Sequence, residues 1–278
     1  MARGQALCIG LNQVDAKHYQ GWTGRLQACE NDAIDLTTLS RSVGFSTTTL
    51  LTAEATRDRV LSALAACAKT LVAGDLLLLT YSGHGGQTPD LNGDEDDRQD
   101  ETWCLYDGQL IDDELYTALG AFAAGVRIFA LSDSCHSGTV LKAAGDEASL
   151  LTFGKKGFER LPFAARVIPA DAAQRTYFAN KAFYDPILKA NTADAIKNVK
   201  ASAVLISGCQ DAETSLDGSF NGLFTGTLLA TWNGGRFKGS YPDFHRAILQ
   251  RIGGTQHPNY FTVGPRNAAF EAMTPFSI

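Results

Sequence analysis

Residues 126–138 (VRIFALSDSCHSG) contain an apolar run that ends directly in a short polar stretch with a cysteine, Cys135. Residues 75–85 (DLLLLTYSGHG) repeat this pattern and end beside a histidine, His84. Continuous apolar runs of this length are typical of buried parallel strands. Since ligands of open parallel sheets bind beyond the carboxyl ends of the strands, we expect His84 and Cys135 at one functional edge.

A cysteine and a histidine at neighbouring strand ends suit nucleophilic catalysis. An imidazole that takes the proton of a thiol makes the sulfur a strong nucleophile. Cys135 is the expected nucleophile and His84 the expected base, and the backbone N–H groups of Gly85 and Cys135 are expected to hold a developing oxyanion. The alternative is a buried structural thiol beside an ordinary histidine, which the joint occurrence of the two settings disfavours.

The signatures YSGHGG (residues 81–86) and DSCHSG (residues 133–138), in this order, resemble those of metacaspases, caspase-like cysteine peptidases of family C14. Supporting stretches are ALCIGLN (6–12), LQACENDAI (26–34), LIDDE (110–114) and LISGCQDAETSLD (205–217). The resemblance covers most of the chain outside residues 143–199. It implies an α/β fold, a caspase-like three-layer sandwich whose central sheet is mostly parallel and carries helices on both faces.

The pattern of the chain agrees with that fold class. Strands are expected at residues 6–12, 47–51, 75–81, 126–131 and 203–207, and helices at 31–42, 57–71, 112–124 and 223–232. Their alternation favours a doubly wound sheet, and Asn31 and Thr56 are expected N-caps. We divide the compact domain into residues 1–142 (p20-like), 143–199 (a linker or insertion) and 200–278 (p10-like).

Residues 143–199 lose regular periodicity and are expected to form a long loop. Their basic residues include Lys155, Lys156, Arg160, Arg166, Arg175, Lys181 and Lys189. The resemblance implies that self-cleavage can occur in this segment, after a basic residue. A solvated insertion is the alternative of equal weight.

Carboxylates near the nucleophile predict the specificity. Asp133 lies two residues before Cys135, where it would attract a cationic side chain. The resemblance implies that Asp32 is a second pocket carboxylate and that Cys29 and Ser82 form the pocket wall. We therefore expect cleavage of proteins or peptides after Arg or Lys. For Asp32 the competing interpretation is stabilisation of a helix N-terminus, worth about 0.3–1 kcal/mol.

Residues 90–101 (DLNGDEDDRQDE) are the most acidic stretch and suggest Ca²⁺, although the spacing is not that of an EF-hand. The resemblance implies a calcium site made of Asp100, Asp112, Asp113 and an acidic residue after the nucleophile, where this chain has Lys142. A cation there removes an oxygen donor and repels a divalent ion. Calcium binding and calcium independence are therefore weighted equally, and Asp112 is alternatively an N-cap.

Composition further limits the partners, the bound groups and the location that can be expected for this protein. The chain has 278 residues and a formal net charge of −6 without a Lys/Arg block, which argues against nucleic-acid binding. Its six cysteines have neither zinc-site nor disulfide-scaffold spacing. No apolar stretch approaches the roughly 18 residues of a membrane span, so the expected location is the cytoplasm. No organic cofactor is implied, and the resemblance implies a monomer.

The sequence as a whole predicts a cysteine endopeptidase in which His84 and Cys135 act as a dyad. Two alternatives are carried forward. One is a non-catalytic caspase-like scaffold, which the intact dyad disfavours. The other is a peptidase specific for Asp, which would need a cationic pocket in place of Asp32 and Asp133.

Overall fold

The computed structural model describes residues 2–93, 98–134, 164–190, 195–208, 216–254 and 256–278, so that Cys135, Lys142 and Cys209 lie outside it. Within these residues the main sheet has the order β11-β9-β7-β3-β1-β2. Neighbouring strands pair in parallel, except that β11 is antiparallel to β9. The strands are β1 (Gly4–Gly10), β2 (Ser46–Leu51), β3 (Leu76–Ser82), β7 (Arg127–Asp133), β9 (Ser202–Ser207) and β11 (Asn259–Val263).

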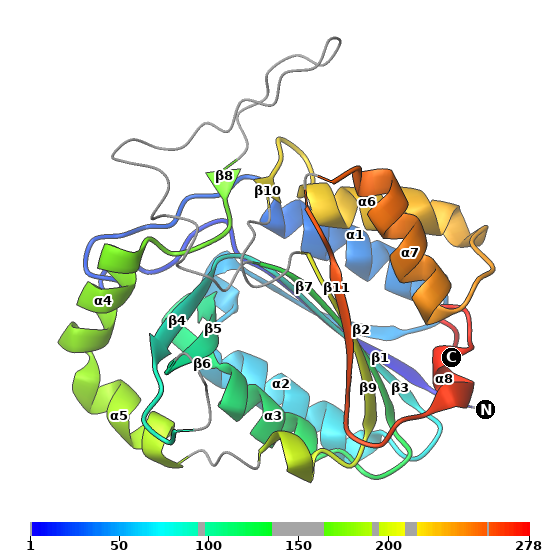
Figure 1. Ribbon diagram of the computed structural model, residues 1–278, viewed down its shortest axis with the longest axis horizontal. Coiled ribbons are helices and arrows are strands. Elements are labelled where there is room, and N and C mark those ends of the chain that lie inside the picture. Colours follow the sequence, from blue (N-terminus) through cyan, green and yellow to red (C-terminus); the bar gives the residue numbers. More distant parts are fainter. Residues whose placement is uncertain (1, 94–97, 135–163, 191–194, 209–215, 255) are drawn as a thin grey trace.

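Helices cover both faces of this sheet, as Figure 1 shows. One face carries α1 (Cys29–Ser42), α6 (Leu223–Trp232) and α7 (Tyr241–Ile252), and the other carries α2 (Arg57–Thr70) and α3 (Asp112–Gly120). The described part also contains α8 (Ala268–Glu271) and three short 3₁₀ turns, Thr52–Glu54, Ile196–Asn198 and Asn233–Gly235. The expected three-layer α/β sandwich is confirmed.

The leucine run of β3 is apolar at every position because both of its faces are buried. Leu77 and Leu79 pack into the core on the α2 and α3 side, whereas Leu76 and Leu78 pack into the core on the α1 side. Successive side chains of a strand point to opposite faces, so a segment buried on both faces reads as a continuous apolar run. In the ladder, Ser82 at the end of β3 lies opposite Asp133 at the end of β7.

A second, antiparallel sheet lies at this end of the main sheet (Figure 1). It consists of β4 (Gly85–Pro89), β5 (Gln99–Leu105) and β6 (Gly108–Ile111), which the sequence pattern did not predict. It is joined to the main sheet by the stacked rings of Tyr81 and Trp103, whose centroids are 4.5 Å apart. Because β4 begins directly after His84, this small sheet fixes the backbone around the expected base.

The expectation of a long loop at residues 143–199 is wrong for its described part. This part contains β8 (Ala164–Ala165), which pairs antiparallel with β10 (Leu216–Asp217), and the helices α4 (Ala170–Ala179) and α5 (Lys181–Ala190). The helices are held by apolar contacts and by the Tyr184 hydroxyl, which accepts a 3.0 Å bond from the N–H of Gln109. Burial against β6 gives this short helix pair a stability that periodicity alone did not indicate.

Two of the expected helix caps are also wrong. The N-cap of α1 is Ala28, not Asn31, and the N-cap of α3 is Ile111, which places Asp112 inside the helix. Thr56 is confirmed, since its side chain accepts a bond from the N–H of Arg59. Among the described residues, no helix combines the length and the apolar character that crossing a membrane requires.

Candidate active site

His84 lies in the turn between β3 and β4 and is 6% exposed. Its Nε2 is 3.0 Å from the carbonyl oxygen of Gly24, and its ring contacts that of Trp22. Burial lowers the pKa of His84 to about 4, and the nearby positive charge of Arg166 acts in the same direction. The imidazole is therefore neutral at physiological pH, which is the form that can accept a proton from a thiol.

The residue expected to lose that proton, Cys135, is outside the described residues. The strand that leads to it is described, and it ends at Asp133 beside the end of β3. The expected oxyanion donor Gly85 is described as well. Its N–H donates a 3.0 Å hydrogen bond to a backbone carbonyl, that of Arg166.

The structure brings the expected pocket residues together. Asp32, in the first turn of α1, accepts a 2.7 Å hydrogen bond from the Ser82 hydroxyl, and its side chain is fully buried. Its other carboxylate oxygen accepts bonds of 3.0 Å from the N–H of Gly222 and the side-chain amide of Asn221. Position in the first turn agrees with helix stabilisation, yet both oxygens are directed to groups outside the helix.

A third carboxylate, Asp217, completes what we call the acidic pocket: Asp32, Asp133, Asp217 and the hydroxyl of Ser82. Asp217 is the last residue of β10 and is held by the N–H groups of Gln27 and Ala28, at 2.7 and 3.2 Å. Cys29 lies in the wall, fully buried, with its Sγ 4.0 Å from an Asp217 oxygen. Burial raises the pKa of Cys29, so this thiol is uncharged.

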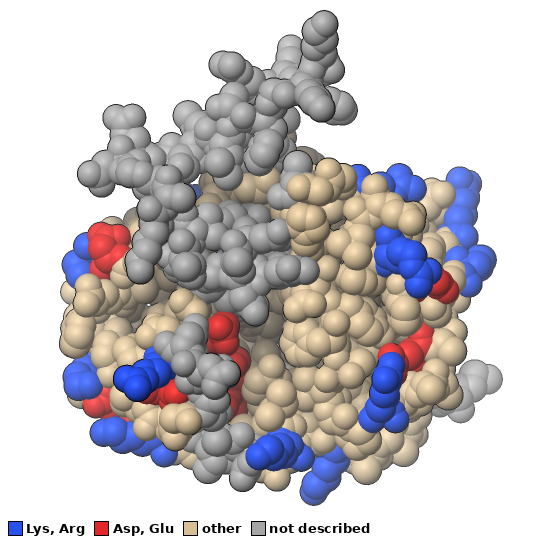
Figure 2. Space-filling model, viewed as in Figure 1, with Lys and Arg blue, Asp and Glu red and all other residues tan. Residues whose placement is uncertain are grey.

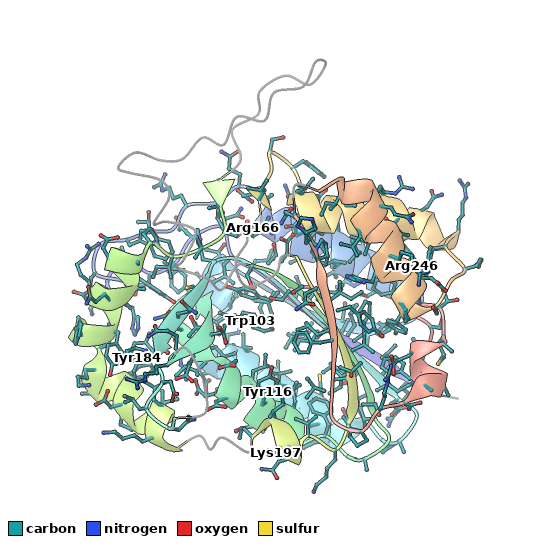
Figure 3. The ribbon with its side chains drawn as sticks, in the orientation of Figure 1. Trp103, Tyr116, Arg166, Tyr184, Lys197 and Arg246 are labelled. Atoms are coloured by element: carbon teal, nitrogen blue, oxygen red, sulfur yellow. The ribbon has the colours of Figure 1, made fainter. Side chains whose placement is uncertain are left out.

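The acidic pocket is filled by the side chain of Arg166, which is itself fully buried. The guanidinium forms ion pairs with Asp32 at 2.7 Å and with Asp133 and Asp217 at 2.9 Å. It also donates a 2.7 Å hydrogen bond to Ser82. Figure 3 shows Arg166 at the upper end of the sheet, beneath β8 and beside α1.

The electrostatics of the acidic pocket favour a cation. Desolvation raises the pKa of Asp32, and the positive charge of Arg166 opposes that rise. Burial acts to lower the pKa of Arg166, but the negative charges of the three carboxylates help to outweigh it and raise that pKa, so the guanidinium stays protonated. Charges buried in this way are destabilising unless they are paired. The arrangement therefore suits a guanidinium or an ammonium and repels a carboxylate.

Sequence reasoning missed two members of this site, Asp217 and Arg166. Asp217 closes the stretch 205–217 that supported the resemblance, but it is a single acidic residue outside any periodic pattern. Arg166 was one of several basic residues in a segment without periodicity. Only the tertiary fold shows that both converge on Asp32 and Asp133.

A second acidic region, which we call the hairpin carboxylates, comprises Asp100, Glu101, Asp112 and Asp113. Burial raises the pKa of Asp112 to about 8, and the charges of Glu101, Asp113 and Asp100 add to that rise. Hard carboxylate oxygens are the donors that Ca²⁺ takes, and a cation would relieve this repulsion. Within the described residues, however, no three acidic, histidine or cysteine side chains converge as metal ligands.

Comparisons with known proteins identify the family. A family model described as "Metacaspase, peptidase C14 domain" matches residues 4–144. Metacaspase-1 of Coccidioides immitis is 31% identical over 261 residues, covering 81% of this chain and 52% of that protein. Metacaspase-1 of Saccharomyces cerevisiae strain S288c is 32% identical over 259 residues, covering 81% and 57%. The chain thus spans just over half the length of these curated relatives.

Two solved structures show the same architecture. A crystal structure of a protein from Geobacter sulfurreducens is 50% identical, with a TM-score of 0.87 and coverage of 99% of this chain and 98% of that one. Caspase-1 from Spodoptera frugiperda is 11% identical with a TM-score of 0.51, covering 95% and 88%, and supports the fold alone. With the matching family model and curated relatives, these similarities show that the chain belongs to the metacaspase family of cysteine peptidases.

Proposed function

We propose that this protein is a cysteine endopeptidase that hydrolyses peptide bonds after Arg or Lys. The observation that carries the proposal is the acidic pocket, in which three buried carboxylates surround a guanidinium. An arginine from a substrate would find the same three partners. Lysine offers the charge but not the planar fork of donors, so arginine is expected to bind more tightly.

The proposed reaction begins with the Cys135 thiol, whose proton His84 accepts. The thiolate attacks the carbonyl carbon after the Arg or Lys residue, and the N–H groups of Gly85 and Cys135 stabilise the oxyanion. His84 then gives the proton to the leaving amine, and water hydrolyses the acyl-enzyme. Asp133 is paired with a cation and with the Thr225 hydroxyl, which limits its effect on the nearby thiol.

The acidic pocket argues against one of the two alternative functions, specificity for Asp, and an experiment is needed to separate the other, a non-catalytic scaffold, from a peptidase. Specificity for Asp is disfavoured because an aspartate side chain would face Asp32, Asp133 and Asp217. A non-catalytic scaffold would keep the same pocket without using the thiol. Labelling separates it from a peptidase, because a thiol-directed peptidyl inhibitor ending in Arg should modify wild-type protein and leave Cys135→Ala unmodified.

Calcium modulation is the second proposal for this protein. Asp100, Asp112 and Asp113 would hold the ion, which would supply positive charge among crowded carboxylates. The raised pKa of Asp112 supports it, and Lys142 argues for weak dependence. Calcium has no part in the proposed chemistry, so removing it should change the rate and leave the preference for Arg intact. Self-cleavage after a basic residue within residues 143–199 is a further part of the proposal, and the burial of Arg166 in the acidic pocket supports it. The monomeric state and the cytoplasmic location stay predictions.

The deciding experiment is hydrolysis of matched fluorogenic peptides that end in Arg, Lys or Asp, with calcium added or chelated. Cys135→Ala serves as the blank. We expect hydrolysis in the order Arg, Lys and then Asp, lost in the blank. Absence of hydrolysis for every peptide in every condition, from folded protein, would contradict the peptidase proposal and favour the scaffold.

A further inference from the structure

The loop between β1 and α1, residues 11–28, fixes one nitrogen of the His84 ring. Nε2 of His84 is 3.0 Å from the carbonyl oxygen of Gly24, and because a carbonyl only accepts hydrogen bonds, Nε2 carries the ring proton. Nδ1 makes no hydrogen bond to the described residues, and the nearby backbone of Val167 affects the pKa less than Gly24 does. Nδ1 is therefore the nitrogen left to accept the proton of a thiol.

Gly24 is packed so closely that the β1–α1 loop cannot move without moving this contact. A Cβ added to Gly24, whose φ is +51°, would lie 2.7 Å from the Trp22 ring and 3.0 Å from Cδ2 of His84. The Trp22 ring meets that of His84 edge-on, with 4.7 Å between centroids. The position of the loop therefore decides which nitrogen of His84 is protonated.

The tip of the β1–α1 loop is held by two different parts of the molecule. On one side, the Tyr19 hydroxyl donates a 2.8 Å hydrogen bond to the carbonyl oxygen of Leu105 in β5. On the other side, Nε2 of His18 lies 2.7 Å from the Tyr184 hydroxyl in α5. The His18 carbonyl also accepts a 3.0 Å bond from the side-chain amide of Asn180, between α4 and α5. The α4–α5 pair thus holds the loop through His18.

The contact between Tyr184 and His18 has a defined direction. The buried Tyr184 hydroxyl accepts the N–H of Gln109 at 3.0 Å, which leaves its single proton for Nε2 of His18. That role requires a neutral His18, and burial lowers the pKa of this half-buried histidine. The charges that act on it are those of Asp107, Arg57 and Asp15. His18 is thus an acceptor near neutral pH.

We propose that Tyr184 and His18 are positioning residues for the base: by holding the loop tip against α5, they keep the Gly24 carbonyl on Nε2 of His84 and leave Nδ1 to take the thiol proton. The inference rests on the proposed function and gives the α4–α5 pair a part in it. Tyr184 acts through His18 and the loop, and neither residue contacts the reacting atoms.

A continuous series of ring contacts joins the two ends of this arrangement. The successive ring centroids are 4.7, 5.7, 5.3 and 5.7 Å apart along His84, Trp22, Tyr19, His18 and Tyr184. Close-packed interiors transmit a displacement instead of absorbing it. Figure 3 shows Tyr184 well separated from Arg166. A change at Tyr184 should therefore act on the base and not on the acidic pocket.

Tyr184→Phe keeps the ring in place and removes the hydroxyl alone. The change breaks the bond to His18 and leaves the N–H of Gln109 unpaired. Losing one such buried hydrogen bond shifts an equilibrium by roughly three- to tenfold. Release of the loop tip should let the second tautomer of His84 form and admit water to the ring, so that the pKa of His84 rises from about 4 toward 6.5.

Three further variants separate this route from a general loss of packing. His18→Leu removes the acceptor, and His18→Gln restores one, because its amide oxygen can accept the Tyr184 proton. Tyr177→Phe is the matched control. Tyr177 is buried in α4, and its hydroxyl donates a 2.8 Å bond to Asp185 within the helix pair. Its loss should affect the helix pair and not the β1–α1 loop.

The first measurement is NMR of the whole chain carrying Cys135→Ala and ¹⁵N-labelled histidine, with His84→Asn used to assign the signals of His84. In this parent and in Tyr177→Phe, His84 should be the Nε2–H tautomer. Tyr184→Phe and His18→Leu should show both tautomers and a raised pKa of His84. His18→Gln should reverse the effect of His18→Leu.

The second measurement is hydrolysis of an Arg-ending peptide as the pH is varied, with the cysteine intact. Tyr184→Phe should lower kcat by roughly three- to tenfold and leave KM within about twofold, since the acidic pocket is unchanged. The acid limb of the kcat/KM profile should move to higher pH with the pKa of His84. Tyr177→Phe should keep both the rate and the profile of the wild type.

Specific results would overturn the inference. An unchanged tautomer and pKa of His84 in folded Tyr184→Phe, or the same changes in Tyr177→Phe, would show that Tyr184 has no particular hold on the base. If Tyr184→Phe fails to fold, His18→Leu and His18→Gln carry the test. If no folded variant hydrolyses any peptide, the proposed function fails, and NMR still decides whether Tyr184 and His18 set the tautomer of His84.

Discussion

The acidic pocket and the hairpin carboxylates contain similar side chains, but the negative charges are paired with a cation in the first region and crowd one another in the second. In the acidic pocket, three carboxylates surround a fully buried guanidinium and accept hydrogen bonds from surrounding groups. Among the hairpin carboxylates, burial and the neighbouring negative charges together raise the pKa of Asp112 to about 8. On the face drawn in Figure 2, Lys and Arg side chains are dispersed around the rim. Local pairing, not the overall charge of the protein, distinguishes the two regions.

The difference shows what each region can do. The acidic pocket is built from the ends of β3 and β7 and the start of α1, so its geometry is fixed by the core. Such a site selects one charged group of defined shape. The hairpin carboxylates instead favour any added positive charge, whether a proton or a metal ion. The acidic pocket therefore suits recognition of one cationic side chain, and the hairpin carboxylates suit a response to pH or to metal ions.

The largest expected effect separates the two regions by activity. In protein that has completed self-cleavage, Asp32→Asn or Asp133→Asn should lower hydrolysis of an Arg-ending peptide by about 100- to 1000-fold. Each change removes one partner of a buried charge pair. The matched change Asp112→Asn should leave that rate within about twofold in chelator. Steady-state kinetics on all three variants measures this. Equal losses at both regions would remove the distinction between them.

The second prediction concerns acid and uses Cys135→Ala to prevent self-cleavage. The folded-state pKa of His84, about 4, lies below its unfolded value of 6.5, so the contribution of His84 to stability is complete above pH 6.5 and is lost as the pH falls toward 4. The free energy of unfolding should drop by up to about 3 kcal/mol over that window. Urea unfolding of Cys135→Ala and His84→Asn/Cys135→Ala checks it, and identical pH slopes would contradict it.

The third prediction tests the shape of the acidic pocket. A Cβ added to Gly222 would lie 2.6 Å from Nη2 of Arg166, and Gly222 has a backbone conformation that alanine adopts without strain (φ −59°, ψ 153°). Gly222→Ala should lower hydrolysis after Arg about tenfold and after Lys by less, since the ammonium is narrower. The ratio of kcat/KM for the two peptides reports this directly. An unchanged ratio would mean that Gly222 does not limit the pocket.

The smallest expected effect on peptide hydrolysis lies at the hairpin carboxylates, where the change is in stability. The folded-state pKa of Asp112 is raised far above 3.8, so its cost to stability is absent below about pH 4 and grows as the pH rises toward 8. Asp112→Asn should therefore stabilise the protein by up to roughly 5 kcal/mol at pH 8 and by almost nothing at pH 4. Thermal unfolding with calcium or chelator tests both parts, since calcium should stabilise only the wild type. Stabilisation of both by calcium would place the ion elsewhere.

The comparison also shows what the sequence could and could not predict. His84 and Asp133 were predictable because continuous apolar runs mark where buried parallel strands end, whereas Ser82 was expected only from the family resemblance. The pairing of β3 with β7 brings these strand ends together. Asp217 and Arg166 were not, because each reaches the site from a short strand of two residues without apolar periodicity. The helices α4 and α5 were missed for a related reason, since they depend on packing against β6.

The contact of Trp22 with His84 has an optical consequence. The chain has three tryptophans. Trp22 lies 4.7 Å from the His84 ring between centroids, and Trp103 donates its indole N–H to Ser132, near the end of β7. Indole emission depends on the polarity and charge around the ring, and two of the three emitters contact His84 or the end of β7. Intrinsic fluorescence should thus change when the charge or the surroundings of His84 change, which allows the state of the site to be followed without a labelled peptide.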